Sequence, residues 1–282
     1  MRGIDLGALG WNVELADNLE HGLEPGRVVA VHRGALDVAT AHGSVRARLP
    51  GKLVYDGVDV GVGDWVGVAG ATVRSVLPRK SAILRKSAGL TSESQTLAAN
   101  VDVAFVVTSL GPDFEVRRIE RYLVTIWESG AVPEVVLTKA DRMDDPWQLA
   151  AEVEAVAVGV PVHVVSAVTG QGCDALRARL APGVTAVLLG SSGVGKSTLV
   201  NRFVGRELMA VKETRVDDDE GRHTTTHREL ILLPGGGIVI DTPGLRELRA
   251  IAMRSDARLR REEKRKWQER VREGRSRARH RR

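Results

Sequence analysis

Cysteine is almost absent from this sequence, and long apolar runs are missing altogether. Cys173 is the one cysteine in 282 residues, which excludes an internal disulfide framework and any zinc site built from several thiolates. No apolar run reaches the ~18 residues that a membrane-spanning helix requires. The first residues, Met-Arg-Gly-Ile-Asp-Leu-Gly, lack the basic-then-apolar order of a signal peptide. These absences predict a cytoplasmic protein with no membrane partner.

The net charge of +5 is distributed unevenly along the chain. Residues 251–282 hold 14 Lys and Arg against five Asp and Glu, a net +9, whereas the other 250 residues carry a net −4. A basic tail of this kind favours a polyanionic partner such as RNA. The alternative is a solvated or disordered tail without a partner. The chain length suggests about two folded domains before this tail.

Residues 25–77 have the pattern of a small β-barrel. Short β-rich segments separated by glycine or polar turns are Arg27–His32, Leu36–Ala41, Val45–Leu49, Asp64–Val68 and Thr72–Leu77. Strands of this number and length predict a closed barrel, with an oligonucleotide-binding (OB) fold as one candidate and an SH3-like barrel as the alternative. Residues 78–96 are polar and show no clear period, so we expect a linker there.

From Val101 onward the pattern alternates between buried strands and helices. The expected strands are Val101–Thr108, Val132–Leu137, Val162–Val165, Val184–Leu189, Glu229–Leu233 and Ile238–Ile240, and the expected helices are Val116–Glu128, Pro146–Val158, Asp174–Leu180 and Ser197–Val204. Continuous apolar runs are typical of strands covered on both faces. The alternation predicts an α/β fold with a doubly wound, mostly parallel sheet.

The segment from Gly190 to Ser197 matches the phosphate-binding loop G-x-x-x-x-G-K-[ST] without a gap. It follows a predicted strand and precedes a predicted helix, as the motif requires. Its glycines would let backbone N–H groups face the phosphates, Lys196 would reach the β- and γ-phosphates, and Ser197 would place its hydroxyl on Mg²⁺. We therefore predict nucleotide contacts from Gly190, Ser191, Ser192, Gly193, Val194, Gly195, Lys196, Ser197 and Thr198.

Thr138-Lys139-Ala140-Asp141 is the segment that would choose the base. It ends a buried strand, where ligands gather in such sheets. The Asp141 carboxylate can accept hydrogen bonds from guanine N1–H and the 2-amino group, whereas adenine offers no such pair. Ser166-Ala167 follows the next strand and would let a backbone N–H approach guanine O6. The base segment lies about fifty residues upstream of the phosphate loop, and this order predicts a circularly permuted GTPase domain.

The chemistry of hydrolysis is expected to involve residues near the end of the last strand. Asp241-Thr242-Pro243-Gly244 follows β-branched residues; Asp241 would bind Mg²⁺, and the Gly244 N–H would meet the γ-phosphate. A threonine of the segment 221–226 would complete the Mg²⁺ shell, and we select Thr225. Leu245 occupies the position at which Ras-like enzymes orient a water with Gln. His223 is the nearest polar candidate for that task, although a lone histidine can also be structural.

Together these motifs resemble one family, the small ribosomal subunit biogenesis GTPases called RsgA, YjeQ or EngC. The shared order is a barrel, then Thr-Lys-Ala-Asp, Ser-Ala, Gly-Ser-Ser-Gly-Val-Gly-Lys-Ser, Gly-Arg-His-Thr-Thr-Thr and Asp-Thr-Pro-Gly. Further resemblance lies in residues 62–66, 77–81 and 98–102. The resemblance implies an N-terminal OB fold, GTP hydrolysis stimulated by the 30S subunit late in its maturation, and a hydrolytic role for His223.

The sequence departs from the family beyond Gly244. The family carries a Cys-rich C-terminal zinc module there, whereas this chain lacks those cysteines, so we expect no zinc site. The basic tail resembles the one that follows the module in some members, so the tail and the barrel would carry the electrostatic share of RNA binding.

The predicted organisation is an OB-fold RNA-binding domain at 1–85, a permuted GTPase domain at 97–250 and a basic helical or disordered tail at 251–282. The predicted protein is a monomeric GTPase that uses GTP, GDP and Mg²⁺ and binds the 30S subunit and its 16S rRNA. Two alternatives remain at this point: a P-loop ATPase or kinase, and an RNA-binding module that uses nucleotide only as a switch.

Overall fold

The computed structural model describes residues 3–86, 94–111, 114–206 and 229–241. Within these ranges the protein divides into two compact units. The first holds residues 3–102, 180–187 and 229–241, and the second holds residues 103–179 and 188–206. No helix in the described ranges is both long and apolar enough to cross a membrane.

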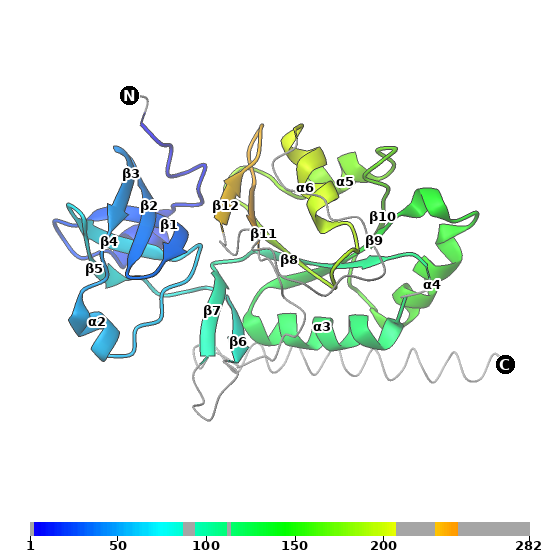
Figure 1. The fold of residues 1–282 in the computed structure, drawn as a ribbon, viewed down its shortest axis with the longest axis horizontal. Helices are drawn as coiled ribbons and strands as arrows, with labels where there is room; N and C mark the ends of the chain where they lie inside the picture. The colour runs from blue at the N-terminus through cyan, green and yellow to red at the C-terminus, as the bar shows by residue number, and fades with distance from the viewer. Residues whose placement is uncertain (1–2, 87–93, 112–113, 207–228, 242–282) are drawn as a thin grey trace, which may run out of the picture. The chain divides into compact units, whose positions relative to one another are not determined.

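The first unit begins with a short helix and an antiparallel barrel (Figure 1). Its elements are α1 (Val13–Asp17), β1 (Glu24–His32), β2 (Ala35–Thr40), β3 (Gly43–Ala47), α2 (Gly51–Tyr55), β4 (Trp65–Ala69) and β5 (Thr72–Val76). Strand β1 pairs with both β2 and β4, β3 pairs with β2, and β5 pairs with β4. A parallel bridge between Arg48 and Thr72 closes the ring. A five-stranded barrel is the arrangement predicted for an OB fold.

Alternating side chains fill the barrel. Its buried members are Val28, Leu36, Val38, Ala47, Val60, Val66, Val68 and Val73. Valine dominates this set because β-branched side chains pack well on a pleated surface. Buried positions alternate along the strands because successive side chains point to opposite faces and only one face meets the interior. The alternation in sequence thus identified the barrel correctly.

The predicted linker at 78–96 is wrong for part of its length. Residues Ala82–Lys86 form β6 and residues Ser94–Ala99 form β7, and the two strands pair antiparallel as a separate sheet. Polar residues occupy much of both strands, so no apolar alternation marks them in the sequence.

The remaining strands of the first unit are β11 (Thr185–Leu189), of which residues 185–187 belong to this unit, β12 (Glu229–Leu232) and β13 (Ile238–Asp241). Strand β13 runs parallel to β11 and antiparallel to β12.

Arg27 is buried at the centre of the first unit, with 1% of its surface exposed. Its guanidinium donates to the carbonyl of Leu9, to that of Gly63 at 3.4 Å, and to the Thr185 hydroxyl at 2.8 Å. A longer contact of 3.5 Å reaches the Asn100 carbonyl, and the guanidinium carbon lies 5.4 Å from the centre of the Trp65 ring. Burial lowers the pKa of Arg27 to about 10, against the opposing charges of Asp102 and Asp64. Arg27 therefore joins segments that are far apart in sequence.

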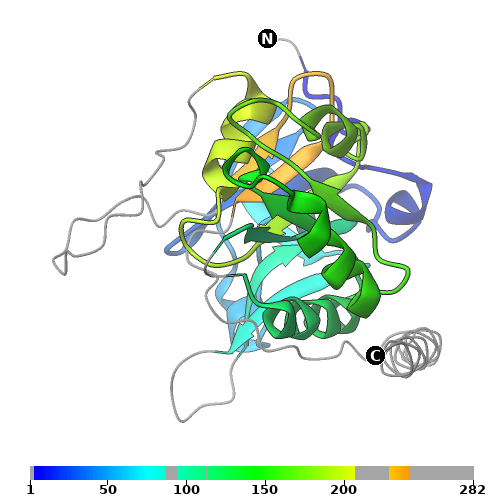
Figure 2. The same cartoon turned by 90° about the vertical axis from the view of Figure 1, so that its right-hand side faces the viewer.

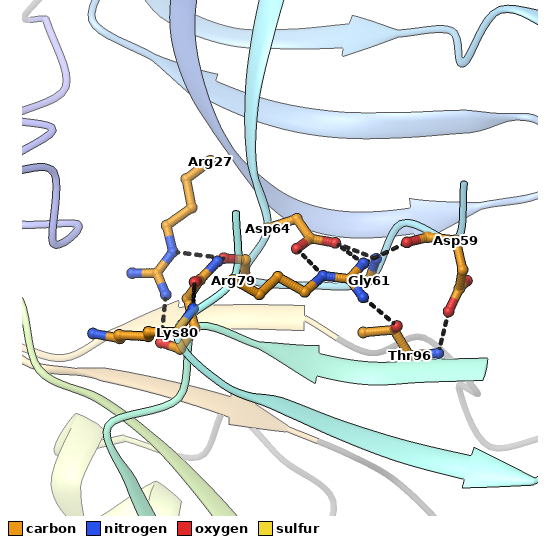
Figure 3. Close-up of polar contacts among 9 residues, drawn as sticks. Arg27, Asp59, Gly61, Asp64, Arg79, Lys80 and Thr96 are labelled. Atoms are coloured by element: carbon orange, nitrogen blue, oxygen red, sulfur yellow. Dashed lines mark hydrogen bonds and ion pairs between the residues drawn. The ribbon is translucent and has the colours of Figure 1, made fainter. Parts of the chain in front are cut away.

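A second cation, the partly buried Arg79, pairs with the fully buried Asp64 (Figure 3). Arg79 Nε and Nη2 each lie 2.6 Å from a different carboxylate oxygen of Asp64, and Nη1 donates to the Thr96 hydroxyl at 2.9 Å. The Gly61 N–H donates to the same carboxylate at 2.8 Å. This network fixes the barrel against β7, which carries Thr96. Asp64 lies in segment 62–66 and Arg79 in segment 77–81, the two barrel segments that resemble the family although neither holds a nucleotide motif.

The second unit is a parallel sheet covered by helices. Its elements are β8 (Val103–Ser109), α3 (Val116–Ser129), β9 (Val132–Thr138), the 3₁₀ turn η1 (Ala140–Arg142), α4 (Pro146–Val156), β10 (Val162–Val164), α5 (Cys173–Ala178) and α6 (Lys196–Val204). Strand β9 lies between β8 and β10, parallel to both. Helix α3 covers one face, whereas α5 and α6 cover the other (Figures 1 and 2). The predicted mixed α/β fold is confirmed.

Local sequence sets the ends of these helices. Asp145 caps α4 by accepting the Trp147 N–H at 3.0 Å, and Pro146 occupies the first turn, where its missing N–H costs nothing. Helix α3 buries Ile119, Tyr122, Leu123 and Ile126 on one face. It ends at Gly130, whose φ of 90° ordinary side chains avoid.

Glu134 is a charged residue inside the apolar run of β9, and its side chain is fully buried. Its carboxylate accepts from Arg179 Nη2 at 2.6 Å and Nε at 2.9 Å, and lies 2.7 Å from His163 Nε2. Burial acts to raise the pKa of Glu134, but the hydrogen bonds from His163 and Arg179 outweigh it and hold the pKa below its usual value. Glu134 therefore remains ionised in the folded protein.

Glu134 should stabilise the fold only above its ordinary pKa. A carboxyl whose pKa is lower in the folded than in the unfolded chain contributes stability above the unfolded value, about 4.3 for Glu, and loses it as the pH falls through the folded value. We expect the urea concentration at which half of the parent protein is unfolded to decrease when the pH is lowered below ~4. Glu134→Gln should lower the midpoint at neutral pH and make this acid dependence shallower. An unchanged pH slope in the variant would contradict the assignment.

Candidate functional site

The predicted phosphate loop joins β11 to α6 in a conformation that depends on glycine. Gly193 and Gly195 have φ values of 78° and 97°, in the left-handed region. Gly190 has a φ of 153°, and a Cβ there would lie 2.1 Å from the Val107 carbonyl oxygen. The backbone can therefore curl tightly only because these positions carry no side chain. Such a curl turns successive N–H groups toward one point, as phosphate binding requires.

Lys196 is the first residue of α6, and its side chain turns back over the loop. Its Nζ donates to the carbonyls of Gly190 and Ser191, each at 2.7 Å. The ammonium therefore lies at the mouth of the loop beside the helix N-terminus. A cation at this point can interact with an anionic group that the loop holds.

Thr138 connects the predicted base segment to the phosphate loop. Its hydroxyl lies 2.5 Å from the Val194 carbonyl oxygen and 3.2 Å from the Thr108 carbonyl oxygen. Thr138 is 2% exposed, so this contact is made inside the protein. The two motifs, about fifty residues apart in sequence, thus lie against each other in space, as the permuted order predicted.

Asp141 and Ser166 also meet. The Ser166 hydroxyl donates to Asp141 Oδ1 at 2.5 Å, while the Thr169 N–H donates to the Ser166 hydroxyl oxygen at 3.1 Å. Ser166 is fully buried and Asp141 is exposed, so the hydroxyl holds the carboxylate from the protein interior and leaves it accessible to a ligand. Lys139 has a φ of 61°, which turns the chain into η1, and the Ala140 N–H bonds to the Val165 carbonyl at 3.2 Å.

Some predicted site residues lie outside the described part of the chain. His223, Thr225 and Gly244 are among these, and their assignments stay predictions. Asp241 is the last residue of β13, although its side chain is not described. Its role as a Mg²⁺ ligand also stays a prediction. Within the described ranges, no group of three or more His, Cys, Asp or Glu side chains is arranged to hold a metal ion.

Two arginines at the site were missed by sequence reasoning. Arg118, on α3, reaches the Ser191 hydroxyl at 3.4 Å, and Arg202, on α6, donates to the Ala167 carbonyl at 3.1 Å. Neither belongs to a recognisable motif. Their helical positions gave no signal because a charged residue on a helix is usually a solvated one.

The fold and the order of its motifs define a class, the P-loop GTPases with circularly permuted motifs. The chain belongs to the RsgA GTPase family, whose model matches residues 76–251. It is therefore a GTP hydrolase, and the alternative of an ATPase or kinase is set aside.

Named relatives and solved structures agree with this family. The chain is 50% identical over 253 residues to the small ribosomal subunit biogenesis GTPase RsgA of Streptomyces coelicolor, a match covering 86% of this chain and 69% of the relative. Identity is 46% over 241 residues to a Lactiplantibacillus plantarum RsgA, covering 81% and 67%. The crystal structure of YjeQ from Thermotoga maritima superposes with a TM-score of 0.61 at 27% identity, covering 78% and 74%. YloQ, described as a circularly permuted GTPase, superposes at 0.56 and 22% identity, covering 81% and 74%, and supports the fold alone.

Proposed function

We propose that this GTPase acts in late maturation of the 30S ribosomal subunit, that it binds the subunit through rRNA, and that the subunit stimulates hydrolysis of GTP to GDP and phosphate. The observation that carries the nucleotide site is the Thr138–Val194 hydrogen bond, because it brings the base segment to the phosphate loop. The names of the relatives support the ribosomal role.

GTP would lie along the loop with its phosphates at the N-terminus of α6 and its base beside Asp141. The described residues fit this ligand: the glycine curl leaves room for backbone N–H donors, and Lys196 supplies a cation. Asp141 would accept from guanine N1–H and the 2-amino group, with Ser166 holding its carboxylate in place. A backbone N–H near Ala167 would meet guanine O6.

Hydrolysis would require residues from both ends of the permuted domain. Ser197, Thr225 and Asp241 would hold Mg²⁺, which supplies charge neutralisation at the β- and γ-phosphates. His223 would orient the attacking water, and the Gly244 N–H would contact the γ-phosphate. Of these residues, only Ser197 has a described side chain.

RNA binding would fall to the barrel and the basic tail. The tail has a net charge of +9 and begins at residue 251, shortly after the proposed γ-phosphate-sensing segment 241–244, so rRNA bound to the tail could bias that segment. We propose a monomer acting in the cytoplasm, with an RNA-binding domain at 1–85, a GTPase domain at 97–250 and the tail at 251–282, and without zinc.

The test is GTP turnover with and without 30S subunits, for the full chain and for one that ends at Ala250. We expect the subunits to stimulate the full chain and to stimulate the shorter chain less. Equal stimulation of both would remove the role of the tail. No stimulation of either, with intrinsic GTP hydrolysis intact, would contradict the ribosomal function.

Lys196→Ala is expected to lower kcat/KM for GTP by about 100-fold, because one charged donor at the transferring phosphate is lost. The measurement is phosphate release under single-turnover conditions. Lys52→Ala, which removes a lysine from α2 in the barrel, is the control and should leave intrinsic turnover unchanged. Equal activity of the two variants would show that Lys196 does not act on the phosphates.

A further inference from the structure

Arg202 connects the helix that follows the phosphate loop to the loop that follows β10. Its Nη1 donates to the carbonyls of Ala167 at 3.1 Å and Val168 at 3.5 Å. Gly170, with a φ of 93°, lies directly against the guanidinium, and a Cβ there would come within 2.1 Å of Arg202 Nη2. The arginine therefore packs onto the loop as well as bonding to it.

The rest of this loop is held by its own backbone. The Gly170 N–H bonds to the Ser166 carbonyl at 2.8 Å, and the Ser166 N–H bonds to the Gln171 carbonyl at 2.9 Å. These bonds hold the start of the loop at Ser166. Its apex is solvent-facing, with Val168 74% exposed. Among the described residues, Arg202 is the one donor that the structure gives to the carbonyls of Ala167 and Val168.

Holding a carbonyl also aims the N–H of the same peptide. The Ala167 C=O and the Val168 N–H belong to one planar peptide and point in opposite directions. When the arginine fixes the carbonyl toward α6, the N–H is fixed away from it. The cation also polarises the peptide and strengthens its N–H as a donor. A donor aimed in this way suits the 6-oxo group of guanine and opposes the 6-amino group of adenine.

We propose that Arg202 is a positioning residue for reading the 6-oxo group of guanine, an inference that rests on the proposed nucleotide site. Arg202 lies six residues, about 1.7 helical turns, after Lys196 on α6. One short helix therefore carries both the cation at the phosphates and the arginine that orients the base loop. Helix α6 would in this way position the contacts to both the phosphates and the guanine.

The surroundings supply a matched control. Arg202 lines a pocket of about 560 Å³ together with Arg206, Arg177, Asn201 and Thr198. Arg206 is exposed and has the same charge as Arg202, but the structure gives it no bond to the loop carbonyls. Arg206→Ala therefore reports the loss of one positive charge from the pocket without loss of the loop contact.

The experiment compares three nucleoside diphosphates by calorimetric titration. GDP has the 6-oxo group, the N1–H and the 2-amino group, IDP lacks the 2-amino group, and the diphosphate of 2-aminopurine riboside lacks the 6-oxo group together with the N1–H. We expect Arg202→Ala to weaken the affinities for GDP and IDP by a similar factor of about five, the size of one ordinary hydrogen bond. The affinity for the 2-aminopurine ligand should change less than about twofold between the parent and Arg202→Ala, because this ligand already lacks the 6-oxo group whose contact the substitution weakens.

The GDP affinity of Arg202→Lys should lie between those of the parent and of Arg202→Ala, because one donor is kept and the fork is lost. Equal weakening of all three ligands by Arg202→Ala, or the same weakening by Arg206→Ala, would overturn the proposal in favour of general packing or charge. A parent protein that binds ADP as tightly as GDP would instead contradict the proposed guanine site itself.

Discussion

Replacing Asp141 with Asn is expected to change the preferred base from guanine to xanthine. Guanine presents two donors, N1–H and the 2-amino group, which a carboxylate can accept together. The amide of Asn offers one acceptor and one donor, which matches the N1–H and 2-oxo groups of xanthine. Because the Ser166 hydroxyl can still donate to the amide oxygen, the side chain should keep its position. GTP binding should weaken by about 1,000-fold or more, since a site built for hydrogen bonds rejects a mismatch strongly.

The measurement is competition of GDP and XDP for the Asp141→Asn protein, followed by turnover with XTP. Asp144→Asn is the matched control, because it makes the same charge change at an exposed residue nearby and should leave GDP affinity unchanged. A variant that keeps its GDP affinity would show that Asp141 does not read the base. Restored turnover with XTP would in addition show that the loss with GTP is not a folding defect.

Arg79→Ala is expected to destabilise the protein by about 3–5 kcal/mol, the cost of leaving a buried charge without its partner. Asp64 is fully buried and would keep only the Gly61 N–H. Burial already raises the pKa of Asp64, against the hydrogen bonds and charge of Arg79. Without Arg79, the carboxyl should take up a proton when the protein folds.

This proton gives the Arg79→Ala variant a distinctive pH dependence. An acid whose pKa is raised in the folded state adds stability below its unfolded pKa, about 3.9 for Asp, and loses it as the pH rises toward the folded value. The stability loss should therefore be larger at pH 7 than at pH 5 in urea unfolding. Arg46→Ala is the control: it breaks a 3.6 Å pair with Asp37 in which Arg46 is 62% exposed, and should cost less than about 1 kcal/mol. Equal losses for the two variants would contradict the structural role of Arg79.

Patterns with a fixed spacing could be predicted from the sequence. The phosphate loop needs glycine wherever its backbone enters the left-handed region, so Gly193 and Gly195 appear as a motif. The strands β8, β9 and β11 appear as apolar runs because both faces are covered. The confirmed α/β fold, the barrel and the permuted order all follow from signals of this local kind.

Features that depend on partners distant in sequence could not be predicted. Glu134 interrupts an apolar strand, and only the positions of His163 and Arg179 explain it. Strand β6 has no apolar–polar alternation to mark it in the sequence, and the structure shows it through its pairing with β7. Arg202 is one charged residue on a helix until the fold brings the Ala167 carbonyl to it.

Arg27 has a consequence for the order in which the chain can mature on the ribosome that makes it. The carbonyl partners at Leu9 and Gly63 are synthesised early, but Asn100 and Thr185 follow much later. In a nascent barrel that ends near residue 85, the acceptors at Asn100 and Thr185 are not yet made, and burying the guanidinium without them would be costly. We therefore expect the barrel to remain loosely packed around Arg27 until synthesis passes Thr185. The barrel then completes its packing when Thr185 supplies its hydroxyl group, and not when the last strand of the barrel has been synthesised.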